Sequence, residues 1–387
     1  MFKIQKLNKI SPQGLQRFPS DLYEHATEIV NPDAILVRSA DMHSLELPQS
    51  LLAIARAGAG VNNIPIDKCS QRGIAVFNTP GANANAVKEL VILGMLLASR
   101  KVYQGITWAK GLAGKRDEVP QLIEKGKSDF TGPEIKGKKL GVIGLGAIGV
   151  MVANDALALG MEVSGYDPFI SVEAAWGLSR SVKRSISLDY LIADSDYITL
   201  HAPLNDKTKG LLNKDKFALM KKGVRILNFA RGGLVNNADL KEAIKNGIVS
   251  FYVTDFPDDD LIQMENIIPI PHLGASTPES EENCADMAVD QLREYLEKGN
   301  IVNSVNFPDC ALIPSGTKRI IIANKNIPAI IGQITQILAE HKINIADMLN
   351  KSKGEYAYNI IDIDGEIDGK VVDQLKKIKD IVMVRVI

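Results

Sequence analysis

Apolar residues occur over the first 280 positions in short runs, separated by longer stretches with helical spacing. A short apolar run bounded by turn residues is typical of a strand buried in a parallel sheet. Four such runs lie before residue 80, at 3–8, 34–39, 51–58 and 74–79, and a helical pattern follows at 86–102. The alternation of strands and helices predicts an α/β domain with a parallel sheet.

A second series of strand candidates begins at residue 139. Its members lie at 139–144, 162–167, 195–202, 224–230, 250–256 and 266–273. Helical patterns separate them, which is the order that a doubly wound dinucleotide-binding sheet requires. A further helical pattern follows at 280–299.

Residues 318–387 have a different pattern from the rest of the chain. Strand candidates lie at 318–326, 343–352, 355–365 and 381–387, and helical patterns lie at 328–343 and 370–378. This β-α-β-β-α-β order predicts a ferredoxin-like fold. Residues 309–317 contain proline, glycine and short polar residues, and we interpret them as a linker.

Composition excludes several classes of protein. The chain has 45 basic and 46 acidic residues, so it has no net field that would attract nucleic acid or a membrane surface. Its apolar run at 90–98 is too short to cross a bilayer. Three scattered cysteines suit neither a disulfide framework nor a metal cluster, so we expect a cytoplasmic protein without a metal.

The sequence GLGAIG at 144–149 follows an apolar strand candidate and precedes a helical stretch. Gly144 permits a tight turn, Gly146 lets the backbone approach a pyrophosphate, and Gly149 allows close packing of helix on strand. Asp167 ends the next strand candidate, about 18 residues further on, where a ribose-binding acid is expected. A carboxylate there would repel a 2′-phosphate, so the pattern predicts NAD rather than NADP.

Three later segments carry residues suited to hydride-transfer chemistry at the ends of strand candidates. They contain Arg231 in NFARGGLVNN, a group of carboxylates in YVTDFPDDD, and His272 in IPIPHLGAST. A histidine can take the proton of a hydroxyl group near neutral pH, and a neighbouring carboxylate stabilises the imidazolium. An arginine can bind a substrate carboxylate through two hydrogen bonds. These segments therefore predict oxidation of a hydroxy acid.

The chain resembles the D-isomer-specific 2-hydroxyacid dehydrogenases over about its first 310 residues. The motifs that carry this resemblance are RAGAGVNNI (56–64), NTPGANANAVKELV (78–91), GLGAIG (144–149), HAPL (201–204), NFARGGLVN (228–236) and PHLGAST (271–277). The resemblance implies a Rossmann-type NAD domain inserted into a flavodoxin-like substrate domain. The implied boundaries are 1–97 with 283–308 for the substrate domain, 98–282 for the NAD domain and 318–387 for the C-terminal domain.

The resemblance also implies roles for individual residues. Arg231 matches the substrate-binding arginine and His272 matches the acid–base histidine. Family members have a glutamate where this chain reads TDFPDDDL, so the partner of the histidine is assigned to Asp259, with Asp260 as the alternative. The backbone N–H groups of Ala59 and Gly60 match donors to the substrate carboxylate.

The residues expected to contact NAD follow from the glycine turn and from the matched motifs. His201 could be read as catalytic, but the resemblance assigns its turn to the adenine side of NAD, and it assigns Asp255 to the nicotinamide carboxamide. The full set is Gly144, Gly146, Ala147, Ile148, Gly149, Asp167, His201, Ala202, Pro203, Ala230, Asp255 and Gly274.

Arg38 and Arg56 end two neighbouring strand candidates. Because the ends of adjacent parallel strands meet at one edge of a sheet, the two guanidinium groups could bind a phosphate in one crevice. The alternative is that both are surface arginines that form local ion pairs.

The C-terminal residues resemble an ACT domain, a small regulatory module. Asn326 and Asn344 match positions that bind L-serine between two paired modules in serine-inhibited relatives, whereas Asn324 replaces a histidine found in some of them. A purely structural role in dimerisation is the alternative. The resemblance also implies a homodimer or homotetramer, which pairs through the NAD domain and through the ACT modules.

Within the family, the chain is most similar to members that oxidise 3-phospho-D-glycerate with NAD to 3-phosphohydroxypyruvate, the first step of phosphorylated serine biosynthesis. One alternative is reduction of another 2-oxo acid, such as hydroxypyruvate or glyoxylate. A second alternative, from another class, is an NAD-sensing transcriptional corepressor. The presence of an arginine, a histidine and acidic residues at the matched positions favours an enzyme.

Overall fold

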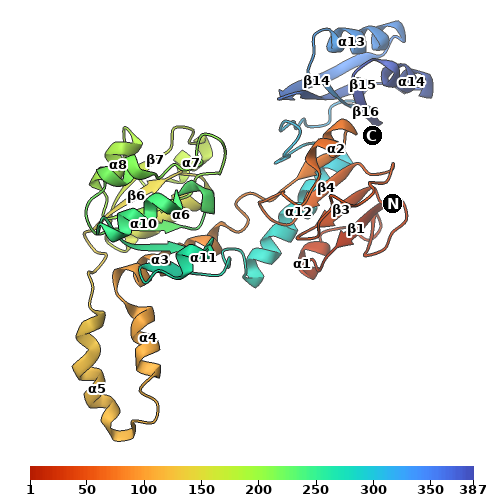
Figure 1. Cartoon of the computed structure of the whole chain (residues 1–387). Helices are drawn as coiled ribbons and strands as arrows, with labels where there is room; N and C mark the ends of the chain where they lie inside the picture. Colours follow the sequence, from red (N-terminus) through yellow and green to blue (C-terminus); the bar gives the residue numbers. More distant parts are fainter. The chain divides into compact units, whose positions relative to one another are not determined.

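A computed structural model describes all residues from 1 to 387, and they form two compact units (Figure 1). Unit 1 contains residues 1–83 and 278–387, and unit 2 contains residues 84–277. These boundaries differ from the expected ones at 97 and 283. Helix α3 (Ala84–Ser99) belongs to unit 2 because Gly94 packs so closely on the sheet there that a Cβ atom would lie 3.0 Å from the Phe229 ring.

Unit 1 contains the first parallel sheet, as predicted. Its strands pair in the order β2-β1-β3-β4-β5, and each pair is parallel. The strands are β1 (Phe2–Leu7), β2 (Tyr23–Ala26), β3 (Ala34–Val37), β4 (Ala53–Arg56) and β5 (Ala75–Phe77). Strand β2 was not predicted, because its sequence YEHA is short and mostly polar.

The helices of this part of unit 1 are α1 (Pro12–Leu15), α2 (Ile66–Gln71) and α12 (Pro278–Lys298). Helix α12 returns the chain to the first sheet and buries Ala288, Leu292 and Tyr295 in the same core as Ile4 and Phe77. The predicted return of the chain to its first domain is therefore found in the structure.

The C-terminal residues form an antiparallel sheet with two helices, in the predicted β-α-β-β-α-β order. The strands pair in the order β14-β15-β13-β16. The elements are β13 (Lys318–Lys325), α13 (Ile330–Glu340), β14 (Asn344–Lys353), β15 (Tyr356–Asp364), α14 (Gly369–Lys377) and β16 (Ile381–Val386). Both helices pack on one face of the sheet, over a core that includes Ile320, Ile322 and Ile361.

The other face of this C-terminal sheet shares a core with the rest of unit 1. Ile321, Ala323, Tyr358 and Ile360 are fully or almost fully buried in the same cluster as Tyr295 of α12. The sheet is therefore not separated by a free linker. Cys310, inside the expected linker, is itself buried and pairs with Ile301 in a β-bridge.

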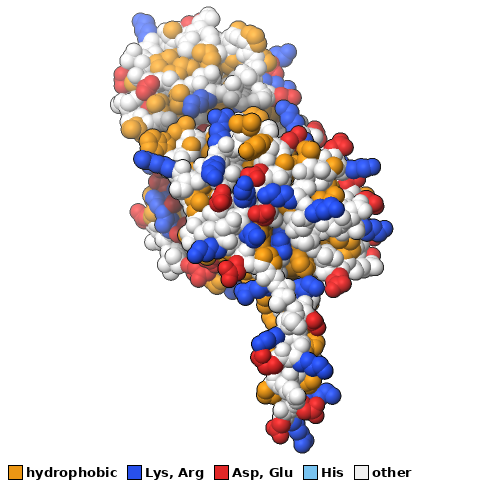
Figure 2. All heavy atoms as spheres, turned by 90° about the vertical axis from the view of Figure 1, so that its left-hand side faces the viewer, with side chains coloured by type: hydrophobic (Ala, Val, Ile, Leu, Met, Phe, Trp, Pro, Cys, Tyr) orange, Lys and Arg blue, Asp and Glu red, His pale blue; other side chains and the backbone are white.

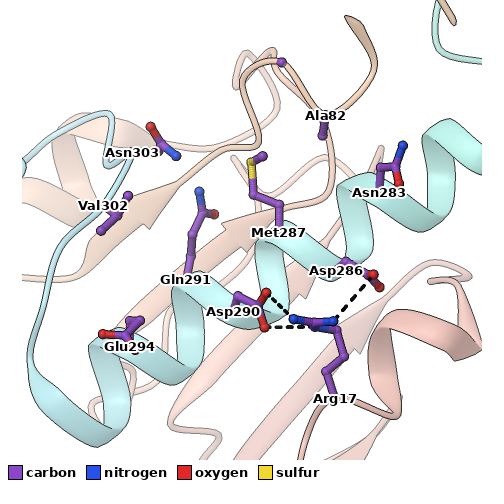
Figure 3. Close-up of a pocket in the computed structure, with 11 residues that line it drawn as sticks. Arg17, Ala82, Asn283, Asp286, Met287, Asp290, Gln291, Glu294, Val302 and Asn303 are labelled. Atoms are coloured by element: carbon purple, nitrogen blue, oxygen red, sulfur yellow. Dashed lines mark hydrogen bonds and ion pairs between the residues drawn. The ribbon is translucent and has the colours of Figure 1, made fainter. Parts of the chain in front are cut away.

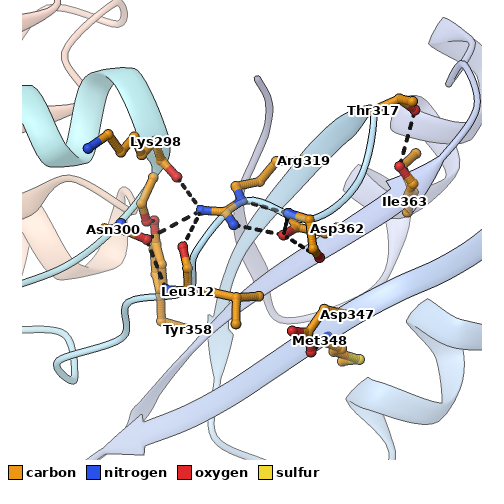
Figure 4. A network of polar contacts seen from close by, with 12 residues as sticks. Lys298, Asn300, Leu312, Thr317, Arg319, Asp347, Met348, Tyr358, Asp362 and Ile363 are labelled. Carbon is orange, nitrogen blue, oxygen red and sulfur yellow. Dashed lines mark hydrogen bonds and ion pairs between the residues drawn. The ribbon is translucent and has the colours of Figure 1, made fainter.

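Two arginines of the C-terminal sheet bind the end of α12, and Figure 4 shows the contacts of the first, Arg319. Arg319 donates to the backbone oxygen of Lys298 at 2.8 Å and forms a buried ion pair with Asp362. Arg385 donates to the oxygens of Tyr295 at 2.8 Å and Leu296 at 2.6 Å. The last carbonyls of a helix lack partners within the helix, and positive charge is favourable there, so these arginines stabilise the end of α12.

Unit 2 contains the second parallel sheet. Its seven strands pair in the order β12-β11-β10-β9-β6-β7-β8, which changes direction between β9 and β6 as in a doubly wound fold. They are β6 (Lys139–Ile143), β7 (Glu162–Tyr166), β8 (Lys183–Arg184), β9 (Tyr197–Leu200), β10 (Val224–Asn228), β11 (Val249–Thr254) and β12 (Ile267–Pro269). The six predicted strands are all present, and only the short, exposed β8 was missed.

The helices of unit 2 cover its sheet, except for a helical arm that extends away from it (Figure 1). The covering helices are α3, α6 (Ala147–Ala158), α7 (Val172–Gly177), α8 (Leu188–Asp194), α9 (Lys214–Leu219), α10 (Asn237–Lys245) and α11 (Asp259–Ile262). The arm contains α4 (Val102–Lys110) and α5 (Val119–Gly126), and neither helix has a buried residue. Basic and acidic side chains are interspersed over the face shown in Figure 2, including the arm.

No helix combines the length and the apolarity that crossing a membrane requires. All three cysteines are buried and unpaired.

Candidate active site

The glycine turn adopts the predicted strand–turn–helix geometry at the point where the strand order reverses. Gly144 follows β6 with a φ of +90°, and a Cβ atom there would lie 2.7 Å from the carbonyl oxygen of His201. Gly146 is the N-cap of α6, and a Cβ atom on it would meet nothing within 4 Å. At Gly149 a Cβ atom would lie 2.0 Å from the oxygen of Gly144. The turn thus leaves open space in front of a helix N-terminus, which suits a pyrophosphate.

Asp167 lies at the end of β7 beside this turn. Its carboxylate accepts hydrogen bonds from the backbone N–H groups of Leu145 and Phe169, both at 2.8 Å. A cavity of about 270 Å³ lies next to it and suits the adenosine part of a dinucleotide. The cavity is lined by Leu145, Gly165, Tyr166, Asp167, Pro168, Ile170, Leu178, Val182, Lys183, Arg184, Ser185 and Ile186.

His201 follows β9, and its backbone lies against Gly144 of the glycine turn. Its Nε2 atom lies 3.0 Å from the hydroxyl of Thr199. Burial lowers the pKa of His201 to about 4, so the imidazole is uncharged at neutral pH. This environment disfavours an acid–base role for His201, and the role of its turn on the adenine side of NAD stays a prediction.

Arg231 lies three residues beyond β10, and the buried side chain of Asn228 holds its backbone. The amide of Asn228 donates to the carbonyl of Arg231 at 2.9 Å and accepts from the N–H of Ala230 and of Arg231. The same amide donates to the hydroxyl of Tyr252 at 3.0 Å. Sequence reasoning missed Asn228; the signal available for it was a polar residue at the end of an apolar strand, three residues before the arginine.

Arg231 and His272 meet at the ring of Phe256. The guanidinium carbon of Arg231 lies 5.9 Å from the centre of this ring, and the imidazole centre of His272 lies 4.6 Å from it. Both side chains are exposed, just beyond the carboxyl ends of their strands. The structure therefore brings the predicted arginine and histidine together, and it adds Phe256, which sequence reasoning did not assign to the site.

Asp255 is the carboxylate that interacts electrostatically with both of these residues. Its side chain is 3% exposed, and its Oδ1 atom has no hydrogen-bond partner. Burial raises its pKa to about 6, while the neighbouring charges of His272 and Arg231 act in the opposite direction. Asp255 is thus a buried carboxylate close enough to His272 and Arg231 for their charges to act on it.

The expected pairing of Asp259 with His272 is not found in the structure. Asp259 is exposed at the start of α11, and its Oδ2 atom lies 3.5 Å from the amide nitrogen of Gln263. Asp260 forms an ion pair with Lys241, and Asp258 caps α11. The short helix α11 directs these three carboxylates towards other partners, and this leaves Asp255 as the acidic group at the histidine.

The predicted substrate residues of unit 1 lie at the ends of β3 and β4. Arg56 donates through Nε to the backbone oxygen of Arg38 at 2.9 Å, which brings the two strand ends together as expected. The guanidinium group of Arg38 forms a 2.8 Å ion pair with Glu281 of α12, which is the alternative that the sequence left open. Ala59 and Gly60 follow β4 in an irregular loop.

The two predicted effector residues lie at opposite ends of β15. Asn326 donates its backbone N–H to Glu355 at 2.8 Å, next to the first residue of β15. Asn344 donates from its side chain to Asp364, the last residue of β15, at 2.9 Å. A single chain therefore does not bring Asn326 and Asn344 together.

Residues 93–274 match the NAD-binding domain of the D-isomer specific 2-hydroxyacid dehydrogenases. The chain is 38% identical to a D-3-phosphoglycerate dehydrogenase of Archaeoglobus fulgidus over 294 residues, which are 73% of this chain and 53% of that protein. It is 31% identical to a D-3-phosphoglycerate dehydrogenase of Haemophilus influenzae over 362 residues, which are 89% of this chain and 83% of that protein. The chain thus spans about half the length of the first of these relatives.

Solved structures agree with these matches. A glyoxylate reductase from Paecilomyes thermophila aligns with a TM-score of 0.64 and 26% identity, over 79% of this chain and 98% of that one. An NAD⁺-bound 3-phosphoglycerate dehydrogenase of Entamoeba histolytica aligns with a TM-score of 0.61 and 25% identity, over the same shares of the two chains. The prediction of NAD as cofactor is confirmed by the domain match. The chain belongs to the D-isomer specific 2-hydroxyacid dehydrogenase family.

Proposed function

We propose that this protein is a D-3-phosphoglycerate dehydrogenase, which oxidises 3-phospho-D-glycerate to 3-phosphohydroxypyruvate with NAD. The observation that carries the proposal is the meeting of Arg231 and His272 at the Phe256 ring, at the ends of β10 and β12. Relatives named D-3-phosphoglycerate dehydrogenase support the choice of substrate.

NAD, when bound at the glycine turn and Asp167, supplies the acceptor for a hydride from C2 of the substrate. A ring nitrogen of His272 takes the proton of the C2 hydroxyl as the hydride leaves C2. Loss of the proton and the hydride oxidises the alcohol to a ketone. Arg231 binds the substrate carboxylate through its guanidinium group. Asp255 supplies negative charge that stabilises the imidazolium of His272 after the proton transfer.

In this proposal, residues of unit 1 bind the phosphate and the carboxylate of the substrate. Arg38 and Arg56 supply two guanidinium groups at adjacent strand ends for the phosphate. Binding of phosphate by Arg38 competes with its ion pair to Glu281, and that pair is partly exposed, so exchanging it costs little.

The test is the formation of NADH, followed by absorbance, with 3-phospho-D-glycerate, D-glycerate and D-lactate as substrates. The proposal expects the largest kcat/KM with 3-phospho-D-glycerate. Preference for an unphosphorylated acid would instead support a hydroxypyruvate or glyoxylate reductase. No turnover of any hydroxy acid, together with NAD binding, would support an NAD-sensing protein that is not an enzyme.

We propose further that the protein assembles as a homo-oligomer with an L-serine site shared between two copies. The arm leaves Tyr103 and Ile106 of α4 and Ile123 of α5 exposed, which suits contact with a second NAD domain. Because Asn326 and Asn344 lie at opposite ends of β15, one copy would supply Asn326 and the other Asn344.

Light scattering measures the assembly, and activity at millimolar L-serine measures the effector. The proposal expects inhibition by serine that Asn344→Ala removes, whereas Asn350→Ala, on the same strand, retains it. Unchanged activity at saturating serine would show that the C-terminal sheet has a structural role only.

A further inference from the structure

The loop after β4 leaves two consecutive backbone donors without acceptors. The N–H groups of Ala59 and Gly60 make no hydrogen bond within the protein. The N–H groups of the two preceding residues, Ala57 and Gly58, both donate to backbone oxygens. Gly58 adopts a φ of +152°, which a residue with a side chain rarely adopts. Successive free N–H groups in such a loop can bind an anion.

The carbonyl oxygens of the same two peptide bonds accept hydrogen bonds from two consecutive residues, Asn78 and Thr79. The backbone N–H of Thr79 donates to the oxygen of Gly58 at 3.2 Å. The side-chain amide of Asn78 donates to the oxygen of Ala59 at 2.6 Å. In a trans peptide the C=O of one residue and the N–H of the next point in opposite directions, and this chain has no cis bond. Fixing these two oxygens therefore directs the N–H groups of Ala59 and Gly60 away from Asn78.

The backbone of Asn78 is itself held by hydrogen bonds to its carbonyl oxygen and from its N–H group. Its carbonyl oxygen accepts a 2.8 Å hydrogen bond from the side chain of Gln291, which is 5% exposed. Its N–H donates to the oxygen of Asn303 at 3.4 Å. Gln291 projects from α12 on the side where Asn303 lies, next to a cavity of about 580 Å³ (Figure 3). The residue that holds the loop is thus anchored to α12 and to the segment that follows it.

The C-terminal sheet reaches the same segment. Lys353, the last residue of β14, donates to the backbone oxygen of Ser304 at 2.8 Å. Ser304 in turn pairs with Phe77, the residue before Asn78, in an antiparallel bridge.

We propose that Asn78 is a positioning residue, which directs the N–H groups of Ala59 and Gly60 at the carboxylate of the substrate. This inference rests on the proposed function for the identity of the substrate, but the loop geometry does not depend on it. Asn78 acts through the loop and does not touch the reacting atoms. Loss of its amide should therefore weaken binding of the carboxylate and leave the chemical step nearly unchanged.

The test compares wild type, Asn78→Ala, Asn78→Asp and a matched control, Asn266→Ala. Asn266 makes the same kind of bond, from its amide to the oxygen of Ser250 at 2.7 Å, but in unit 2. In Asn78→Ala we expect the KM for 3-phospho-D-glycerate to rise about tenfold, with kcat and the KM for NAD changed by less than about twofold. Asn78→Asp should raise KM further, because a carboxylate would then face the carbonyl of Ala59 and repel it. Asn266→Ala should leave all three constants unchanged.

Binding of oxalate, measured by calorimetry, separates this inference from the proposed function. If wild type does not oxidise 3-phospho-D-glycerate, the proposed function fails, but a weaker affinity for oxalate in Asn78→Ala still supports the positioning role. Thermal melts establish that each variant is folded. An unchanged KM and oxalate affinity in Asn78→Ala, an equal loss in Asn266→Ala, or no binding of oxalate by wild type would each overturn the proposal.

Discussion

Both parallel sheets carry their candidate site residues at the carboxyl ends of strands, but they present different chemical groups there. Unit 2 presents side chains: Arg231 and His272 both lie beside the Phe256 ring, and the buried Asp255 interacts electrostatically with both. Unit 1 presents backbone N–H groups, at Ala59 and Gly60, and arginines that already have protein partners. In the proposed function, unit 2 supplies the groups for the chemistry and unit 1 supplies groups that can bind anions.

Replacement of the histidine should have the largest effect. His272→Ala removes the group that takes the hydroxyl proton, so we expect kcat to fall by about 10³-fold while the affinity for NAD stays the same. Steady-state kinetics and titration with NADH measure the two quantities. His341→Ala is the matched control, since this exposed histidine of unit 1 bonds only to Gln374. Retained turnover in His272→Ala would assign the base elsewhere.

The arginine of unit 2 comes next. Arg231→Ala removes the bidentate contact with the carboxylate, and we expect kcat/KM to fall by about 10²-fold. Arg17→Ala serves as the control because Arg17 forms only surface ion pairs with Asp286 and Asp290. Equal losses in the two variants would show that general destabilisation, not substrate binding, causes the effect.

A third pair of variants compares the two candidate aspartates. Asp255→Asn removes the negative charge that faces His272, and we expect kcat/KM to fall by roughly tenfold or more. Asp259→Asn should change it by less than about twofold, because Asp259 contacts only Gln263. The opposite order of effects would restore the assignment made from the sequence.

The same aspartate predicts a pH dependence of stability. Its pKa is about 6 in the folded protein, above the ordinary value of 3.8. Between these values the folded protein holds a proton that the unfolded chain releases, so the contribution of Asp255 to the free energy of unfolding falls as the pH rises. Denaturant unfolding at pH 4 and pH 7 should show that Asp255→Asn gains stability relative to wild type at the higher pH. A constant difference between the two proteins would contradict the assigned pKa.

The smallest effect is expected in unit 1. Arg38→Ala should raise the KM for 3-phospho-D-glycerate by about fivefold to tenfold and leave the KM for an unphosphorylated substrate unchanged, since the partner Arg56 remains. Arg72→Ala is the control, because Arg72 bonds the carbonyls of Leu47 and Pro48 instead. A rise in KM for both kinds of substrate would contradict the phosphate role of Arg38.

Local patterns in the sequence were sufficient to predict much of the fold. The dinucleotide-binding segment from Gly144 to Asp167 was predicted because the strand, the glycines and the acid follow one another at short spacing. Six strands of unit 2 were predicted from their apolar runs, whereas β2 and β8 were missed because each is short and mostly polar. The first domain boundary was expected after residue 97 but lies before residue 84. The sequence of α3 is apolar on several sides and does not show which sheet it covers.

The site was predicted less completely, because its remaining contacts join distant segments. Counting along TDFPDDD could not show that α11 turns Asp259 away from the histidine. Phe256 contacts residues that follow the two neighbouring strands, so its place in the site depends on the order of the strands and not on local spacing. Arg231 and His272 each lie three residues after their own strand, so the sequence alone could place both at the same edge of the sheet.

The contacts of Arg319 and Arg385 with the end of α12 bear on how this protein can be shortened. A catalytic fragment made by cutting the chain between 309 and 317 would lose both guanidinium groups and would leave the carbonyls of Tyr295, Leu296 and Lys298 without them. It would also uncover the apolar side of Tyr295 that Arg385 now covers at 5.1 Å. The C-terminal sheet is therefore a structural support of the rest of unit 1, and a fragment that lacks it would need compensating substitutions along α12.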